Sequence, residues 1–279
     1  MKPVALTIAG SDCSAGAGLQ ADLKTFSALG VYGLTAVTCV VAEVPGKVGR
    51  IQAIEAANVR EQIELLLENF PVAAVKTGLL LSPEIVALVA EIFAARAAQK
   101  IPLVIDPVMV ATSGAALLQP EAVAIYRAQL FPLATLLTPN MAEAAVLSGL
   151  PVTNLAEMRV AGAKLKAEFG AKVLVKGGHL TGASAIDLLF EGAEVSEFAA
   201  PRVAGVSTHG TGCTYSAAIT AGLAHGLALP EAIGSAKKFV SRAIAGHLSW
   251  AQSGRKIDAL EHGHTERSVA EGRDPVGFP

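Results

Sequence analysis

The sequence is poor in cysteine and in net charge. Its three cysteines, Cys13, Cys39 and Cys213, are far apart and form no C-x-x-C pair. An odd, dispersed set argues against both a disulfide framework and a cysteine zinc site, so a reducing cytoplasm is the expected compartment. The net charge is −2 and the basic residues are scattered, which argues against nucleic acid or an anionic membrane as a partner.

Long apolar runs and an ordinary phosphate-binding loop are also missing. No stretch approaches the ~18 to 20 apolar residues of a membrane span. The start, "MKPVALTIAGSD", has a short apolar run that ends at Gly10, without the longer core and cleavage site of a signal peptide. No G-x-x-x-x-G-K-[ST] pattern occurs, so an ordinary P-loop is excluded. We expect a soluble protein that acts on small molecules.

What is present is an alternation of short apolar runs with segments of helical period, in 279 residues of which 52% are apolar. The expected strands are 4–9, 34–42, 73–78, 102–107, 135–139, 172–177 and 185–190, and the expected helices are 16–30, 57–70, 82–98, 120–130, 140–148, 155–169, 212–226 and 230–248. Such uniformly apolar strands are typical of a mainly parallel sheet with helices on both faces. We expect one α/β domain over 1–250 and a peripheral or poorly ordered polar tail over 251–279.

In such sheets, ligands bind beyond the carboxyl ends of the strands. The loop after the first expected strand contains Gly16, Gly18 and Ala21, a loose G-x-G-x-x-[GA] match, and Glu43 could hold a ribose. The insertion "SDCSA" before Gly16 argues against a dinucleotide fingerprint. Taken alone, the loop leaves open an NAD-dependent oxidoreductase and a simple tight turn. Asp22 either complements the helix dipole or points into a pocket with Glu43.

The late loop "HGTGCT", residues 209–214, places two glycines before a helix whose first N–H groups are free to face an anion. Cys213 lies at this helix N-terminus. We expect the positive end of the dipole to lower the pKa of the Cys213 thiol, so that its thiolate could accept a proton. The alternative is a small buried side chain with no chemical role, which is the commoner fate of a free cysteine.

Two further strand ends carry polar groups. Asn140 and Glu143, three residues apart in "TPNMAEA", suit a hydrated Mg²⁺ beside phosphates. Lys176, in "VKGGH", follows another strand, where its ammonium could meet a polyphosphate. Singly, each is more often a helix cap or a solvated charge. Their placement at corresponding ends of successive strands favours a shared site.

Together these stretches resemble the ribokinase-like superfamily and, within it, the hydroxymethylpyrimidine and phosphomethylpyrimidine kinases of thiamine biosynthesis. The resemblance runs from about Ala5 to His247, through "LTIAGSDCSAGAGLQADLKTFSALGVYG", "VVAE", "VKTGLL", "VIDPVM", "TPNMAEA", "LVKGGH" and "THGTGCT". It implies a ribokinase-like three-layer fold with no separate lid domain, usually assembled as a homodimer. It also implies that ATP and Mg²⁺ are used to phosphorylate 4-amino-5-hydroxymethyl-2-methylpyrimidine and then its monophosphate.

The resemblance further implies roles for residues at matching positions. Cys213 would deprotonate the attacking hydroxyl, and the backbone N–H groups of Gly210, Thr211 and Gly212 would form an anion hole with its own. Asn140 and Glu143 would organise Mg²⁺ through water, and Lys176 would neutralise phosphate charge. Asp22 and Glu43 would hydrogen-bond the pyrimidine, whose ring pocket would be lined by Gly10, Ala17, Leu79 and Val108.

Pyridoxal kinase is a close alternative, because some vitamin B6 kinases share the cysteine-bearing late loop and pyridoxal also carries a hydroxymethyl group on a nitrogen heterocycle. Glu43 modestly favours the pyrimidine, since a carboxylate only accepts hydrogen bonds and the exocyclic amine supplies two donors. An oxidoreductase would leave Lys176, Asn140 and Glu143 unexplained. A non-catalytic binding domain would lose no activity when Cys213 is altered.

Overall fold

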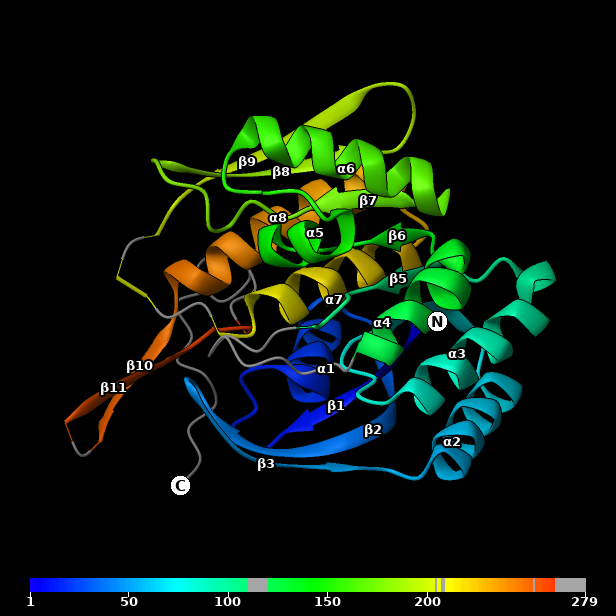
Figure 1. The fold of residues 1–279 in the computed structure, drawn as a ribbon. Helices are drawn as coiled ribbons and strands as arrows, with labels where there is room; N and C mark the ends of the chain where they lie inside the picture. The colour runs from blue at the N-terminus through cyan, green and yellow to red at the C-terminus, as the bar shows by residue number, and fades with distance from the viewer. Residues whose placement is uncertain (110–119, 204, 207–208, 253, 264–279) are drawn as a thin grey trace.

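A computed structural model describes residues 1–109, 120–203, 205–206, 209–252 and 254–263. Within them, a nine-stranded sheet has the order β3-β2-β1-β4-β5-β6-β7-β8-β9 (Figure 1). The strands are β1 (Val4–Asp12), β2 (Tyr32–Val44), β3 (Lys47–Ala53), β4 (Val72–Thr77), β5 (Leu103–Ile105), β6 (Leu136–Leu137), β7 (Lys172–Val175), β8 (Ser184–Phe190) and β9 (Val195–Pro201). The central pairings from β2 to β7 are parallel, whereas β3, β8 and β9 pair antiparallel at the two edges.

Helices cover both faces of this sheet, as Figure 1 shows. One layer contains α1 (Gly18–Ala28), α7 (Thr211–Ala224) and α8 (Leu229–Ala245). The opposite layer contains α2 (Ala56–Asn69), α3 (Pro83–Ala95), α4 (Pro120–Ile125), α5 (Met141–Ser148) and α6 (Leu155–Phe169). The expected three-layer α/β fold with a mostly parallel sheet is therefore confirmed.

The double layer follows from the strand sequences. Along β1, Leu6 and Ile8 enter the core beneath α2 and α3, whereas Ala5 packs on the face of α1 and α7. All three side chains are fully buried. Because successive side chains of a strand point to opposite faces, a strand in a sheet covered on both faces is apolar at most of its positions.

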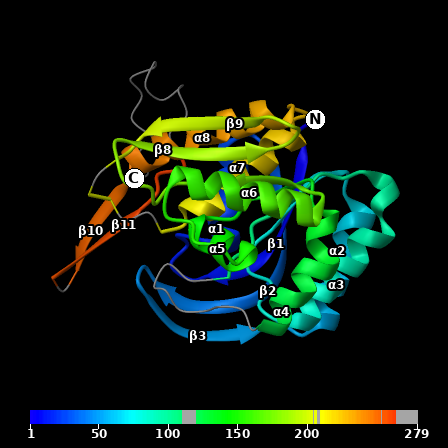
Figure 2. The ribbon, with the colours of Figure 1, turned by 45° about the horizontal axis from the view of Figure 1, so that its top comes forward.

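The edge strands are where the sequence prediction was incomplete. β3 and β9 were not expected, and both have largely exposed side chains. Figure 2 shows β2 and β3 at one edge of the sheet and β8 and β9 at the other. β3 continues β2 through a tight turn in which Gly46 has φ 81°, a conformation that favours glycine. Edge strands need only one partner and one apolar face, so they lack the continuous apolar runs that identify the central ones.

The described part of the expected polar tail contains a hairpin that the sequence did not predict. β10 (Leu248–Gln252) and β11 (Arg255–Ala259) form an antiparallel hairpin. After the hairpin, Leu260 and His262 are buried. The polar alternation of the hairpin concealed it, because most of its side chains face solvent. Residues 264–279 lie outside the described part of the chain.

None of the helices in the described ranges has both the length and the apolar character needed to cross a membrane.

Candidate active site

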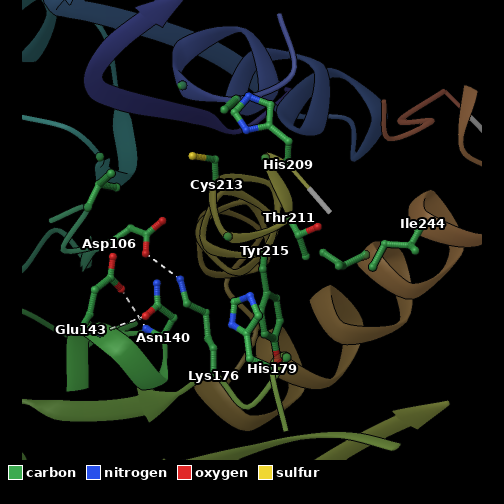
Figure 3. Close-up of a pocket in the computed structure, with 18 of the residues that line it drawn as sticks. Asp106, Asn140, Glu143, Lys176, His179, His209, Thr211, Cys213, Tyr215 and Ile244 are labelled. Carbon is green, nitrogen blue, oxygen red and sulfur yellow. Dashed lines mark hydrogen bonds and ion pairs between the residues drawn. The ribbon is translucent and has the colours of Figure 1, made fainter. Parts of the chain in front are cut away.

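A cavity of about 510 Å³ opens where the carboxyl ends of several strands meet the N-terminus of α7. Twelve of the thirteen residues that the sequence assigned to the site line it, and the exception is Asp22. The twelve are Gly10, Ala17, Glu43, Leu79, Val108, Asn140, Glu143, Lys176, Gly210, Thr211, Gly212 and Cys213. Figure 3 shows Asp106, Asn140, Glu143 and Lys176 on one side of the cavity, with Cys213 and His209 projecting from another.

The loop before α7 is held tightly against the first loop of the chain. Gly210 is the N-cap of α7 and has φ 80°. A Cβ atom at this position would lie 1.7 Å from the carbonyl oxygen of Gly16. Only glycine permits both the positive φ and this close approach. The N–H groups at the start of α7 are thereby presented to the cavity, as an anion hole requires.

Asp12 and His209 connect the same two loops, and the sequence analysis gave neither a role. The Asp12 carboxylate accepts hydrogen bonds from the backbone N–H groups of Ser14, Gly16 and Ala17 at 2.7, 3.2 and 2.8 Å. His209 Nε2 lies 3.3 Å from Asp12 Oδ2, the oxygen that also accepts from Gly16 and Ala17. The pair ties the glycine-rich first loop to the α7 loop. The sequence could have indicated both residues, because Asp12 and His209 each stand just before a glycine-rich stretch in the quoted motifs.

Lys176 and Asp106 form a buried ion pair at the floor of the cavity. Lys176 Nζ lies 2.7 Å from Asp106 Oδ1, and the Thr138 and Ser216 hydroxyls donate to the same carboxylate at 3.1 and 3.2 Å. A Cβ atom on Gly212 would lie 3.3 Å from Lys176 Nζ, so the ammonium stands beside the α7 loop. Asp106 lies within the quoted "VIDPVM", but the sequence analysis did not assign it.

Asn140 and Glu143 form a reciprocal capping box on α5. The Asn140 side chain accepts from the Glu143 N–H at 2.9 Å, and Glu143 accepts from the Asn140 N–H at 2.8 Å. Burial raises the pKa of Glu143 to about 7, against the opposing effect of the Lys176 ammonium. Near neutral pH the protonated and the ionised forms of Glu143 are therefore both accessible.

This donor set fits a hydrated Mg²⁺. No group of three His, Cys, Asp or Glu side chains close enough to hold a metal occurs within the described ranges. Mg²⁺ in phosphate-transferring enzymes keeps several waters and takes one or two carboxylates besides the phosphates. Asp106, Glu143 and Asn140, all on the cavity wall, supply such oxygens. A cation there would also stabilise the ionised form of Glu143.

Glu143→Gln tests this assignment, because glutamine keeps the capping box and removes only the charge. For the ATP- and Mg²⁺-dependent kinase that the sequence motifs predict, we expect kcat to fall about tenfold, the lower end for a residue that acts on a metal through water. The raised pKa of Glu143 makes its neutral form the stable one in the free protein, so its contribution to stability is lost as pH rises through about 7. The variant should therefore be more stable than the wild type above pH 8 without nucleotide.

Glu157→Gln is the matched control, because Glu157 makes a similar cap on α6 at an exposed site. Activity measured against MgCl₂ concentration, with thermal unfolding at pH 6 and pH 8.5, separates the two effects. Unchanged magnesium dependence in Glu143→Gln would contradict the proposed metal role.

Cys213 lies half-buried on the cavity wall at the start of α7. Burial raises the pKa of its thiol to about 11, and the Lys76 ammonium offsets this only in part. The expectation that the helix terminus would make the thiol more acidic was wrong. Loss of hydration outweighs the dipole here, so the free protein holds Cys213 as a neutral thiol at pH 7.

Asp22 is the predicted residue that the structure places elsewhere. Its carboxylate is fully buried, with both oxygens 2.8 Å from Lys76 Nζ. Thr7 also donates to it at 2.6 Å. Lys76 forms part of the cavity wall, whereas Asp22 lies behind it. Burial alone would lower the pKa of Lys76, but the Asp22 carboxylate raises it, so Lys76 stays charged.

The end of the cavity near β1 and β2 is mostly apolar. Gly10, Ala17, Leu79 and Val108 line it together with Val41. Glu43 and Asp12 are carboxylates at this end, and burial, together with the negative charge of Asp12, raises the pKa of Glu43. The Glu43 N–H donates to Cys13 Sγ at 3.3 Å, which fixes the end of β2 against the first loop. This arrangement suits a flat heterocycle with one polar edge.

The opposite end contains a third buried ion pair, which the sequence did not predict. Lys237 Nζ lies 2.6 Å from Asp187 Oδ2. The same Nζ atom lies 5.8 Å from the centre of the Tyr215 ring. Ile244 and Val240 line the same end. An aromatic ring, aliphatic side chains and a few charges are typical of a site for a large organic ligand. These residues come from β8, α7 and α8, whose spacing in the sequence gives no sign of their proximity.

The geometry therefore joins an apolar ring pocket, an anion-binding loop and a lysine in one cavity. Residues 12–258 match the family model described as phosphomethylpyrimidine kinase. The chain belongs to the phosphomethylpyrimidine kinase family. It is 45% identical, over 99% of its length and 97% of the relative's, to a hydroxymethylpyrimidine/phosphomethylpyrimidine kinase of Rhizobium meliloti. Membership of this kinase family overturns the oxidoreductase alternative.

Solved structures support the same fold for this phosphomethylpyrimidine kinase family member. An ADP complex of Bacillus subtilis pyridoxal kinase has a TM-score of 0.85 at 38% identity, covering 94% of this chain and 98% of that one. Staphylococcus aureus pyridoxal kinase in complex with AMP-PCP and pyridoxal has a TM-score of 0.84 at 35% identity, covering 94% of each chain. The ribokinase-like fold inferred from the sequence motifs is confirmed.

Proposed function

We propose that this chain transfers the γ-phosphoryl group of ATP to 4-amino-5-hydroxymethyl-2-methylpyrimidine and then phosphorylates the monophosphate to the diphosphate. The observation that carries the proposal is the convergence on one cavity of Glu43, the α7 loop and the Lys176–Asp106 pair. Glu43 suits the amino group on the ring of the substrate. The α7 loop suits the transferred phosphoryl group, and the Lys176–Asp106 pair suits the polyphosphate of ATP. The Rhizobium meliloti relative bears the name of this activity.

Each part of the cavity would have a separate role in the reaction. The ring would lie in the apolar end with its amino group toward Glu43, and its hydroxymethyl group toward Cys213. Backbone N–H groups of Gly210, Thr211 and Gly212 would face the charge that develops on the moving phosphoryl group. The Lys176 ammonium, beside the same loop, would neutralise phosphate oxygens. Bound Mg²⁺ would supply further neutralisation and hold the phosphates in line.

The second end of the cavity supports ATP as the phosphoryl donor. The Tyr215 ring and the aliphatic Ile244 and Val240 would accept a base, and Lys237 and Asp187 offer polar contacts for a ribose. AMP-PCP, an ATP analogue, is named in the structure of the Staphylococcus aureus pyridoxal kinase.

Pyridoxal remains the second candidate substrate, because two structural relatives are pyridoxal kinases. We expect kcat/KM for the pyrimidine to exceed that for pyridoxal at least tenfold, since only the pyrimidine offers an amino group to Glu43. Glu43→Leu should lower kcat/KM for the pyrimidine about tenfold and for pyridoxal less than threefold. Glu43→Gln, which keeps an acceptor oxygen, is the matched control. Coupled measurement of ADP release with each substrate decides the question, and a clear preference for pyridoxal would overturn the proposal.

We also propose that the chain forms a homodimer, as the resemblance to the family implies, and that it acts in the cytoplasm, as its three dispersed cysteines indicate. Size-exclusion chromatography with light scattering tests whether the protein is a homodimer.

A further inference from the structure

The chain after β11 folds back onto the helices of the active site. Figure 1 shows the β10–β11 hairpin extending from the end of α8, with β11 returning toward the start of α7. The Glu261 N–H then donates to the Ala243 carbonyl oxygen of α8 at 3.1 Å. Leu260 and His262 are 4% and 6% exposed. These residues lie beyond the segment 12–258 that matches the family model.

His262 reaches the first turn of α7. Its Nε2 atom lies 3.0 Å from the Thr214 hydroxyl, and both side chains are buried. Burial lowers the pKa of His262, and the nearby Lys24 ammonium lowers it further. A neutral imidazole has one donor and one acceptor nitrogen. The Leu260 backbone favours a protonated ring nitrogen and partly opposes this lowering of the pKa. With that proton on Nδ1, Nε2 accepts from Thr214.

Thr214 follows Cys213 directly and closes the first turn of α7, since its N–H donates to the Gly210 carbonyl oxygen at 2.9 Å. On the cavity side, the same turn is held by the contact of Gly210 with Gly16. Ser216, two residues further along α7, donates to Asp106 at 3.2 Å. The bond to His262 is a further contact on this first turn, made from the segment after β11. A shift of the first turn would move the Cys213 thiol and the anion-hole N–H groups together.

We propose that His262 is a positioning residue for phosphoryl transfer: through Thr214, the segment after β11 fixes the first turn of α7 and so the placement of Cys213 and the anion hole. This inference rests on the proposed kinase function. His262 touches no substrate in this scheme, because it does not line the cavity. Loss of His262 should therefore lower kcat, which reports the chemical step, and leave the binding of substrate and nucleotide unchanged.

Two variants of His262 separate this role from simple packing. His262→Phe keeps a buried ring and removes the acceptor, and we expect kcat to fall about fivefold to tenfold, the scale of one hydrogen bond. KM for the pyrimidine and for Mg-ATP should stay within about twofold. His262→Gln places an amide oxygen near the position of Nε2 and should restore kcat to within about twofold of the wild type. Assays well below the melting temperature of each variant exclude partial unfolding as the cause.

Variants of Thr214 test the same hydrogen bond from its other partner. Thr214→Val, which replaces the hydroxyl with a methyl group, should lower kcat as much as His262→Phe, and the double variant should lose no more than either single one. Thr214→Ser should retain kcat. Additive losses, or a raised KM with unchanged kcat, would overturn the inference.

Amide hydrogen exchange makes the test independent of the substrate. We expect the N–H of Thr214 to exchange faster in His262→Phe than in the wild type, and unchanged exchange would overturn the inference even if the protein phosphorylated neither compound. Wild-type protein that acts only on pyridoxal would contradict the proposed substrate alone, and the same kcat comparison would then be made with pyridoxal.

Discussion

Replacing Cys213 with alanine is expected to lower kcat by about 10²-fold or more, the usual scale for a positioned general base. KM for Mg-ATP should change little, because Lys176 and the α7 backbone remain. The thiol lies at the start of α7, beside the N–H groups proposed to face the phosphoryl group. Steady-state kinetics with saturating pyrimidine and ATP measure the loss.

The pH dependence sharpens this prediction. A base must be deprotonated to act, and burial raises the pKa of Cys213 to about 11. kcat/KM should therefore rise with pH from 7 to 10 in the wild type. Cys213→Asp should retain part of the activity, because aspartate can act as the base. Its profile should be flatter over this range, since a carboxylate is already ionised at pH 7.

Cys213→Ser is the matched control for packing. Serine keeps the size and the hydrogen-bonding group of cysteine, but its hydroxyl is far less acidic than a thiol. A loss close to that of the alanine variant would indicate proton transfer, whereas near-normal turnover in either variant would contradict the role of Cys213 as the base.

The sequence predicted the central sheet and most of the cavity because both depend on local patterns. Short, mostly apolar strands such as β1 can be recognised from their residues alone. The glycines around Gly210 indicate a backbone that must approach a neighbour closely. The edge strands β3 and β9 follow no such rule, because half of their surface faces water. The hairpin after α8 was missed for the same reason.

The sequence does not show which residues from distant segments become partners when the chain packs. Asp187 and Lys237 are 50 positions apart, and their pairing depends on how β8 packs against α8. The acidity of Cys213 was misjudged in a similar way. The helix dipole is visible in the sequence, but the loss of hydration that outweighs it depends on the packed cavity wall.

Asp22→Asn is expected to lower the free energy of unfolding by about 3 to 5 kcal/mol, the usual result of removing one partner from a buried ion pair. Asp22 and Lys76 are both fully buried, and they lie 2.8 Å apart. The amide would leave the Lys76 ammonium without its counter-charge. Urea denaturation monitored by circular dichroism measures the change. If Asp22 instead contacted the pyrimidine, the variant would show a raised KM with nearly normal stability.

A double variant, Asp22→Leu with Lys76→Met, distinguishes stability from chemistry. Replacing a buried pair by apolar side chains of similar size is often neutral or stabilising, so most of the lost stability should return. Turnover should not return, because Lys76 is the positive charge that makes the Cys213 thiol easier to ionise. Recovery of both would indicate that the pair only supports the fold. Recovery of stability alone would assign Asp22 the task of holding a charged lysine behind the proposed base.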